Sequence, residues 1–150
     1  MGRTNFWKVA IDIIHAFPIL GAGLNTYGRV APQFTTNWGG YYAHNCYLQM
    51  TAETGILGFF SFMWIIGRLF VRTWRNVRRI ADQFLYTILL GFFTGWTAFM
   101  IHSFVDTNFY SVQLGTLLWL LMAVLVTIEK LGTNPDAQDS KTQSIPSLTK

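Results

Sequence analysis

The residues best suited to chemistry lie in the run HNCYLQMTAETG, residues 44–55. Histidine titrates near neutral pH, so it can accept a proton from a hydroxyl group or orient that group. At 100° per residue, eleven positions make roughly three helical turns, so a helix through this run would place His44 and Gly55 on one face. We expect His44 at the outer mouth of that helix, where water, a glycan and a lipid headgroup meet. A histidine that merely caps or lines the helix start is the alternative.

Other polar residues lie at the edges of apolar stretches. His102 and Asp106 are four positions apart, which predicts one helical face for both. They are either functional or a local pair that ends the helix. We interpret Glu53 as a polar contact to a helix outside the chain, His15 as a packing residue and the single cysteine, Cys46, as incidental. The chain has no Asp-x-Asp pair and no histidines at metal-ligand spacing, so we expect no metal and no cofactor.

Three apolar stretches must position these residues: 56–71, 84–101 and 109–128. A bilayer core needs roughly 20 residues, which the first stretch reaches if its helix begins near Tyr47. Hydrophobic residues make up 51% of the chain and charged residues 12%, which is too little polar surface for a soluble domain. The sequence therefore predicts an all-α, multi-pass integral membrane protein with about three transmembrane helices. Gly55, Gly58 and Gly67 would allow close helix approach.

The charges between the first two apolar stretches predict the orientation. That connection carries Arg68, Arg72, Arg75, Arg78 and Arg79. Because arginine-rich connections face the cytoplasm, residues 1–54 and the short connection 106–108 should lie outside, with the C-terminus inside. The net charge of +4 then reflects membrane topology, and no nucleic acid is expected as a partner.

The chain divides into three predicted parts. Residues 1–54 form a periplasmic or extracytoplasmic segment, with an amphipathic helix that Pro18 ends. Residues 55–128 form the three-helix transmembrane region, and 129–150, rich in polar residues, a disordered cytoplasmic tail. Because some fifty residues must be carried outside, we expect that further transmembrane helices precede this chain in the complete protein.

Four short motifs follow one another in the outer segment. They are Arg3-Thr4-Asn5-Phe6-Trp7, the run PILGAGLN at 18–25, the run HNCYLQ at 44–49, and the ten-residue interval between His44 and Gly55. In type, order and spacing they are similar to the R-x3-W (or R-x3-L), P-hydrophobic-hydrophobic-G-x-G, HN-x-YL and H-x10-G motifs of the O-antigen ligase and polymerase family. The resemblance extends over roughly residues 3–128.

The resemblance implies a GT-C-like, inverting membrane glycosyltransferase of the bacterial inner (cytoplasmic) membrane. Members of this family move a glycan from undecaprenyl diphosphate to a sugar hydroxyl, either on lipid A–core or on a growing glycan. The departing diphosphate needs cations, and the planar fork of arginine suits phosphate. The resemblance assigns Arg3 to the diphosphate and His44 to the acceptor, with Asp106 as a further acidic catalytic residue.

Three further residues are expected to bind substrate: Arg29, Asn45 and Gly55. For Arg29, contact with lipid phosphate is the preferred alternative. The isolated chain should have little activity, because the donor-binding helices would be missing. The motifs do not distinguish a ligase from a polymerase. A ligase that acts on teichoic acid or on protein acceptors is a further alternative. Two alternatives belong to other classes of protein. The chain could be a small non-enzymatic membrane subunit, or a transporter fragment, for which only His102, Asp106 and Glu53 give an indication.

Overall fold

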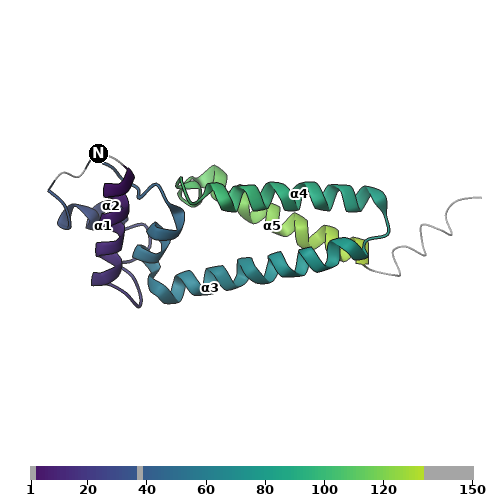
Figure 1. Cartoon of the computed structure of the whole chain (residues 1–150), viewed down its shortest axis with the longest axis horizontal. Coiled ribbons are helices and arrows are strands. Elements are labelled where there is room, and N and C mark those ends of the chain that lie inside the picture. Colours follow the sequence, from purple (N-terminus) through teal and green to yellow (C-terminus); the bar gives the residue numbers. More distant parts are fainter. Residues whose placement is uncertain (1–2, 37–38, 134–150) are drawn as a thin grey trace, which may run out of the picture.

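The computed structural model describes residues 3–36 and 39–133, which form helices and loops without any strand (Figure 1). In chain order the elements are α1 (Arg3–Ala16), α2 (Tyr27–Val30), the 3-10 turn η1 (Ala31–Gln33), α3 (Cys46–Asn76), η2 (Val77–Arg79), α4 (Gln83–His102), η3 (Asn108–Tyr110) and α5 (Val112–Thr133).

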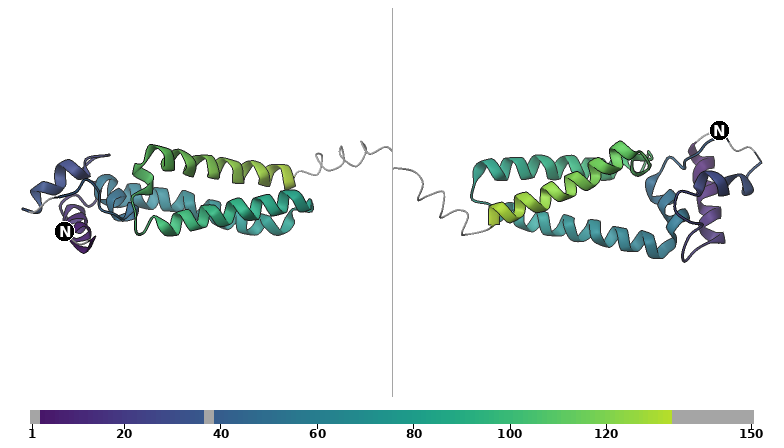
Figure 2. Two further views of the ribbon diagram at one scale, coloured as in Figure 1. Left: turned by 90° about the horizontal axis from the view of Figure 1, so that it is seen from above. Right: turned by 180° about the vertical axis from the view of Figure 1, so that it is seen from behind.

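The long helices α3, α4 and α5 form an elongated bundle, and α1 and α2 lie at one end of it (Figures 1 and 2). Each of the three is long and apolar enough to cross a membrane. Large side chains such as Phe60, Trp64 and Trp119 are more than half exposed on the bundle, as expected of surfaces that face lipid. The predicted fold class, an all-α multi-pass membrane protein with about three spans, is confirmed.

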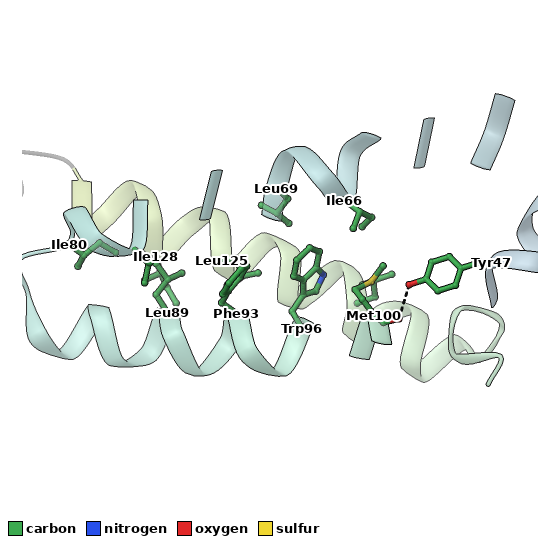
Figure 3. Close-up of a cluster of buried hydrophobic side chains, with 12 residues drawn as sticks. Tyr47, Ile66, Leu69, Ile80, Leu89, Phe93, Trp96, Met100, Leu125 and Ile128 are labelled. Atoms are coloured by element: carbon green, nitrogen blue, oxygen red, sulfur yellow. Dashed lines mark hydrogen bonds between the residues drawn. The ribbon is translucent and has the colours of Figure 1, made fainter. Parts of the chain in front are cut away.

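The bundle is held together by apolar side chains from all three helices (Figure 3). Its core comprises Ile66 and Leu69 of α3, Leu89, Phe93, Trp96 and Met100 of α4, and Leu118, Leu125 and Ile128 of α5, together with Tyr47, Val77 and Ile80. At the end nearest α1, the Tyr47 hydroxyl donates a hydrogen bond of 2.7 Å to the carbonyl oxygen of Met100. The first and second spans are therefore joined on the side where the candidate site lies.

Helix α1 is amphipathic, as predicted, and ends two residues before Pro18. It lies across the beginning of α3 (Figure 1) and buries Val9, Ala10 and Ile13 in a second apolar cluster. That cluster also includes Tyr27, Ala31, Ala43 and Ala52. The first turns of α3 are thus covered by α1 and α2, whereas its remainder belongs to the bundle.

A polar clamp joins α3 to α5 at the far end of the bundle. The Glu129 carboxylate is 1% exposed and accepts hydrogen bonds from the Nε of Arg72 at 2.7 Å and the Nδ2 of Asn76 at 3.1 Å. The Thr73 hydroxyl donates to its second oxygen. The predicted tail was expected to begin at residue 129, and this was wrong because α5 continues to Thr133 and buries Glu129. Residues 134–150 lie outside the described part of the chain.

Gly55, Gly58 and Gly67, which were expected to allow close helix approach, do not lie at contacts between the described helices. A Cβ on Gly67 would meet no atom within 4 Å, and one on Gly58 would meet Thr54 of the same helix. Gly55 contacts a loop rather than a helix. The prediction of close helix–helix approach at these positions was therefore wrong within the described structure.

Candidate functional site

Helix α3 is broken at Gly55, which adopts φ 69° and ψ −177°. In an uninterrupted helix, the amide groups of Ile56 and Leu57 would donate to the carbonyl groups of Ala52 and Glu53. The break frees these four groups, and each requires another partner.

The loop after α1 provides all four partners. Ala22 N donates to Ala52 O and Gly23 N to Glu53 O, both at 2.9 Å, whereas Ile56 N donates to Pro18 O at 2.9 Å and Leu57 N to Ile19 O at 3.4 Å. Residues 18–23, which we call the docking loop, therefore lie directly against the break. Two motifs that are far apart in the sequence form one interlocking structure.

Glycine is required on both sides of this contact. Gly21 and Gly55 both have positive φ, which side chains other than glycine rarely adopt. A Cβ on Gly55 would lie 2.1 Å from the carbonyl oxygen of Ile19, and one on Gly21 would lie 2.3 Å from the backbone of Glu53. Gly55 thus has a structural role here, and its predicted role in binding substrate stays a prediction.

The buried carboxylate of Glu53 holds the next part of the loop. It is 1% exposed and accepts hydrogen bonds from Asn25 N at 2.8 Å, Tyr27 N at 3.1 Å, the Tyr110 hydroxyl at 3.1 Å and Gln49 Nε2 at 3.4 Å. The interpretation of Glu53 as a contact to a helix outside the chain was wrong, because these donors are its own neighbours. Glu53 is the main residue that sequence reasoning missed. A carboxylate two residues before the glycine of H-x10-G was the available signal.

Two tyrosines beside Glu53 are held in the neutral form. Burial, reinforced by the negative charge of Glu53, raises the pKa of Tyr27 and that of Tyr110 above the ordinary value of 10.0. A neutral phenol retains its proton and can donate it in a hydrogen bond. Tyr110 donates to Glu53, and Tyr27 donates to the carbonyl oxygen of Phe6 at 2.8 Å. Helices α1, α2 and α3 and the α4–α5 connection are thereby linked.

His44 lies just before α3 rather than within it. Its φ is 52°, and its ring packs edge-on against Phe6 of α1 with the ring centroids 5.5 Å apart. On either side, Ala43 N donates to the Oε1 of Gln49 at 2.9 Å, and the side chain of Asn45 caps α3 by accepting from the amides of Tyr47 and Leu48. The prediction that His44 and Gly55 share one helical face was wrong, because α3 begins at Cys46 and breaks at Gly55.

The neighbours of His44 thus hold its half-buried imidazole at the surface of this end of the molecule. We call this end, which comprises α1, the docking loop, α2, the start of α3 and the α4–α5 connection, the cap. Its left-handed backbone conformation is uncommon outside glycine, although histidine, asparagine and aspartate tolerate it better than most residues. Backbone strain of this kind often accompanies functional sites.

The two predicted arginines lie on elements of the same cap. Arg3 is exposed at the start of α1, three positions before Phe6, so the two are neighbours on the helix surface. Arg29 is exposed in the short helix α2. Asn45 is buried, and the oxygen of its side chain is occupied by the helix cap.

The α4–α5 connection is anchored beside His44. Cys46 N donates to the carbonyl oxygens of Ser103 at 2.9 Å and Asp106 at 3.1 Å. Because Cys46 is two residues after His44 in the chain, these bonds hold the backbone of Asp106 near that histidine. The predicted His102–Asp106 helical pair was wrong because α4 ends at His102. The Nδ1 of His102 lies 3.0 Å from Asn108 Nδ2, and the exposed Asp106 carboxylate accepts from Thr107 N.

The elements at this end of the bundle carry a histidine, a carboxylate and two exposed arginines. Histidine and carboxylate can move protons, and arginine can neutralise phosphate. Within residues 3–36 and 39–133, no three His, Cys, Asp or Glu side chains are grouped so as to hold a metal ion.

These features define a multi-pass, all-helical membrane protein with a polar cap at one membrane surface. Residues 1–63 match the family described as O-antigen ligase, which confirms the resemblance recognised from the motifs over that part of the chain. The match includes α1, the docking loop, His44 and the break in α3. The family implies a membrane glycosyltransferase of the O-antigen ligase or polymerase type. Searches of curated proteins and of solved structures found no match.

Proposed function

We propose that this chain is the C-terminal part of a bacterial inner-membrane glycosyltransferase. It would transfer a glycan from undecaprenyl diphosphate to an acceptor sugar hydroxyl on the outer face of that membrane, as an O-antigen ligase acting on lipid A–core. The main support is the environment of His44: the family motifs build a rigid cap whose exposed edge carries this half-buried imidazole, next to the helix that begins at Arg3.

The proposed reaction is an inverting displacement. The acceptor oxygen attacks the anomeric carbon of the donor glycan while the imidazole of His44 takes the hydroxyl proton. The bond between that carbon and the diphosphate oxygen breaks, and its electron pair leaves with undecaprenyl diphosphate. Arg3 is proposed to stabilise the charge that develops on the diphosphate. Asp106 and Arg29 lie on the same cap and are proposed as secondary catalytic and substrate contacts.

The sharpest test of the histidine is His44→Asn in the gene product that contains this chain. Asparagine tolerates the left-handed backbone of position 44 but supplies no base near neutral pH. We expect lipopolysaccharide of the variant strain to lose its O-antigen at least 100-fold, within the range of general-base contributions. The matched control is His15→Asn, which should leave attachment unchanged because His15 is exposed on α1, and its interpretation as a packing residue was wrong.

Arg3→Ala should have a comparable effect, with Lys8→Ala as the control on the same helix. The amount of each variant in the membrane is measured alongside the lipopolysaccharide. If the variants at His44 and Arg3 are present in normal amounts and still attach O-antigen, the catalytic assignment fails. Normal O-antigen attachment in these variants is what we would expect if the chain were a small non-enzymatic subunit.

Asn45 offers a separate test, because the structure gives it a capping role. Asn45→Asp retains an oxygen acceptor for the amides of Tyr47 and Leu48 and should remain active, whereas Asn45→Ala should lose about 1 kcal/mol of stability. If Asn45→Asp is stable but inactive, the amide contacts substrate directly.

The product pattern distinguishes ligase from polymerase. Loss of a ligase should leave lipid A–core without any polymer, whereas loss of a polymerase should leave cores that carry a single repeat. Gel analysis of lipopolysaccharide from the His44→Asn strain therefore decides between the two proposed activities.

A further inference from the structure

A concavity lies at the end of the bundle remote from α1. It has a volume of about 430 Å³ and is lined by Arg68, Leu69, Val71, Arg72, Arg75, Asn76 and Arg79. The four arginines recur every three or four residues, so they form one stripe along the last turns of α3 and into η2. This groove is far along α3 from the His44 cap (Figure 1).

Most of the positive charge in the arginine groove is not neutralised by the described residues. The one ion pair among residues 3–36 and 39–133 joins Arg72 to Glu129, and the Arg72 side chain remains 47% exposed. Arg68 lies over the ring of Trp64, with its Cζ 6.0 Å from the ring centroid. Arg75 and Arg79 are exposed. A groove of this composition suits an anion that several arginines can contact at once.

Apolar surface adjoins the same arginines. Val71 lines the groove and is 54% exposed, and Trp64, whose ring contacts Arg68, is 70% exposed. Tryptophan is enriched where a helix passes the membrane–water boundary. A ligand held here would therefore have a phosphate among arginines and hydrocarbon beside it, which describes a phospholipid rather than a free anion.

We propose that the arginine groove is a binding site for an anionic membrane phospholipid. Its phosphate group would lie among Arg68, Arg72, Arg75 and Arg79, and its acyl chains would run along the apolar surface beside Val71. Basic pockets at membrane surfaces bind anionic headgroups in this way. The site is independent of the proposed glycan transfer, because it lies at the other end of the bundle.

The test is lipid binding to the purified chain in a neutral detergent, followed by native mass spectrometry. Phosphatidylglycerol is compared with phosphatidylcholine of the same acyl chains. The unaltered chain should bind phosphatidylglycerol at least tenfold more tightly. The variant Arg75→Gln/Arg79→Gln should lose about 30-fold of this affinity, because each arginine near an anionic lipid contributes ~1 kcal/mol and 1.4 kcal/mol corresponds to tenfold.

The matched control is Arg78→Gln/Lys130→Gln. It removes two positive charges from the same end of the bundle, but neither residue lines the groove. Its affinity should stay within about threefold of the unaltered chain, since the groove keeps its four arginines and the two lost charges lie outside it. Helix content of both variants is measured by circular dichroism. If the double variant does not fold, Arg79→Gln alone should lose about fivefold.

Three results would overturn the proposal. The first is equal binding of the two lipids, and the second is an equal loss of affinity in the two double variants. The third is displacement of phosphatidylglycerol by inorganic phosphate at the same ionic strength as a chloride control, which would make the groove a site for free phosphate.

Discussion

At the scale of single residues, Glu53 contributes more to the cap than its position at the edge of an apolar stretch suggests. Its carboxylate joins Asn25, two residues after the docking loop, to the start of α2 at Tyr27 and to the α4–α5 connection at Tyr110. These donors satisfy a charge that would otherwise be costly to bury. Within residues 3–36 and 39–133 the carboxylate forms no ion pair, and hydrogen bonds stabilise it.

We predict that Glu53→Ala locally unfolds the docking loop. The amides of Asn25 and Tyr27 would lose their acceptor, and a buried unsatisfied group costs roughly 1–3 kcal/mol. Hydrogen exchange of residues 19–27 should therefore accelerate on the order of 100-fold, while the amides of α4 and α5 keep their protection. Asp12→Ala, which removes an exposed acidic residue from α1, is the control and should change neither region. Similar exchange in both variants would contradict the role given to Glu53.

At the scale of elements, the break in α3 replaces two helical hydrogen bonds by four bonds to the docking loop. The helix therefore loses little hydrogen bonding at the point where it changes direction. The docking loop is held by hydrogen bonds of its backbone. The side chains of Ile19 and Leu20 take no part in this contact and are 63% and 75% exposed. These exposed apolar side chains lie where the cap meets the first span, so they are available to contact lipid.

Gly55→Ala tests this arrangement. A left-handed backbone costs an L-residue about 1–2 kcal/mol, and the new Cβ would overlap the carbonyl oxygen of Ile19. We expect the free energy of unfolding to fall by at least ~2 kcal/mol, measured by denaturant titration in detergent. Gly67→Ala in the same helix is the control: nothing lies within 4 Å of its Cβ, and alanine should be neutral or stabilise by up to about 1 kcal/mol. Equal effects of the two substitutions would count against the interlock.

Some elements were predicted correctly and others were missed, because only some of them are encoded in the local amino-acid sequence. The three spans and the amphipathic α1 were predicted to within a few residues, because long apolar runs and helical spacing are properties of the local sequence. The break at Gly55 was missed because a lone glycine inside a helical pattern is usually tolerated. Only the docking loop, more than thirty positions earlier, explains it.

The surroundings of the candidate site were predicted only in part for a similar reason, and the catalytic and binding roles of its residues stay predictions. The motifs identified the stretch that carries His44, and the structure places Arg3, Arg29 and Asp106 on the same cap as that histidine. The partners of Glu53, the capping role of Asn45 and the early end of α4 depend on tertiary contacts, which residue spacing does not reveal.

At the scale of the whole molecule, polar contacts fasten the bundle at both ends while its middle is apolar. At one end, Cys46 N is bonded to the α4–α5 connection, and at the other the Glu129 carboxylate joins α5 to α3. The aromatic and aliphatic core between them has few polar groups that could fix the register of the helices. The clamp at Glu129 therefore sets how α3 and α5 are aligned.

Glu129→Ala should weaken the bundle as a whole. Arg72 and Thr73 would lose their acceptor, and because Arg72 is about half exposed we expect a loss of roughly 2–3 kcal/mol rather than the larger cost of a fully buried pair. Thermal unfolding in detergent measures it. The adjacent Lys130→Ala is the control, since Lys130 is exposed and its loss should remain within about 0.5 kcal/mol. An unchanged melting temperature for Glu129→Ala would show that the apolar core alone sets the register.

The first part of α3 is fixed at both of its ends, and this explains why the interval between His44 and Gly55 has a set length. This piece is tied at Cys46 to the α4–α5 connection and at Gly55 to the docking loop, so its nine helical residues span a fixed gap of about 13.5 Å. One residue more would lengthen it by about 1.5 Å and turn everything beyond by 100°. The length of the interval therefore fixes the position of the His44 imidazole relative to the Glu53 carboxylate, which holds the loop.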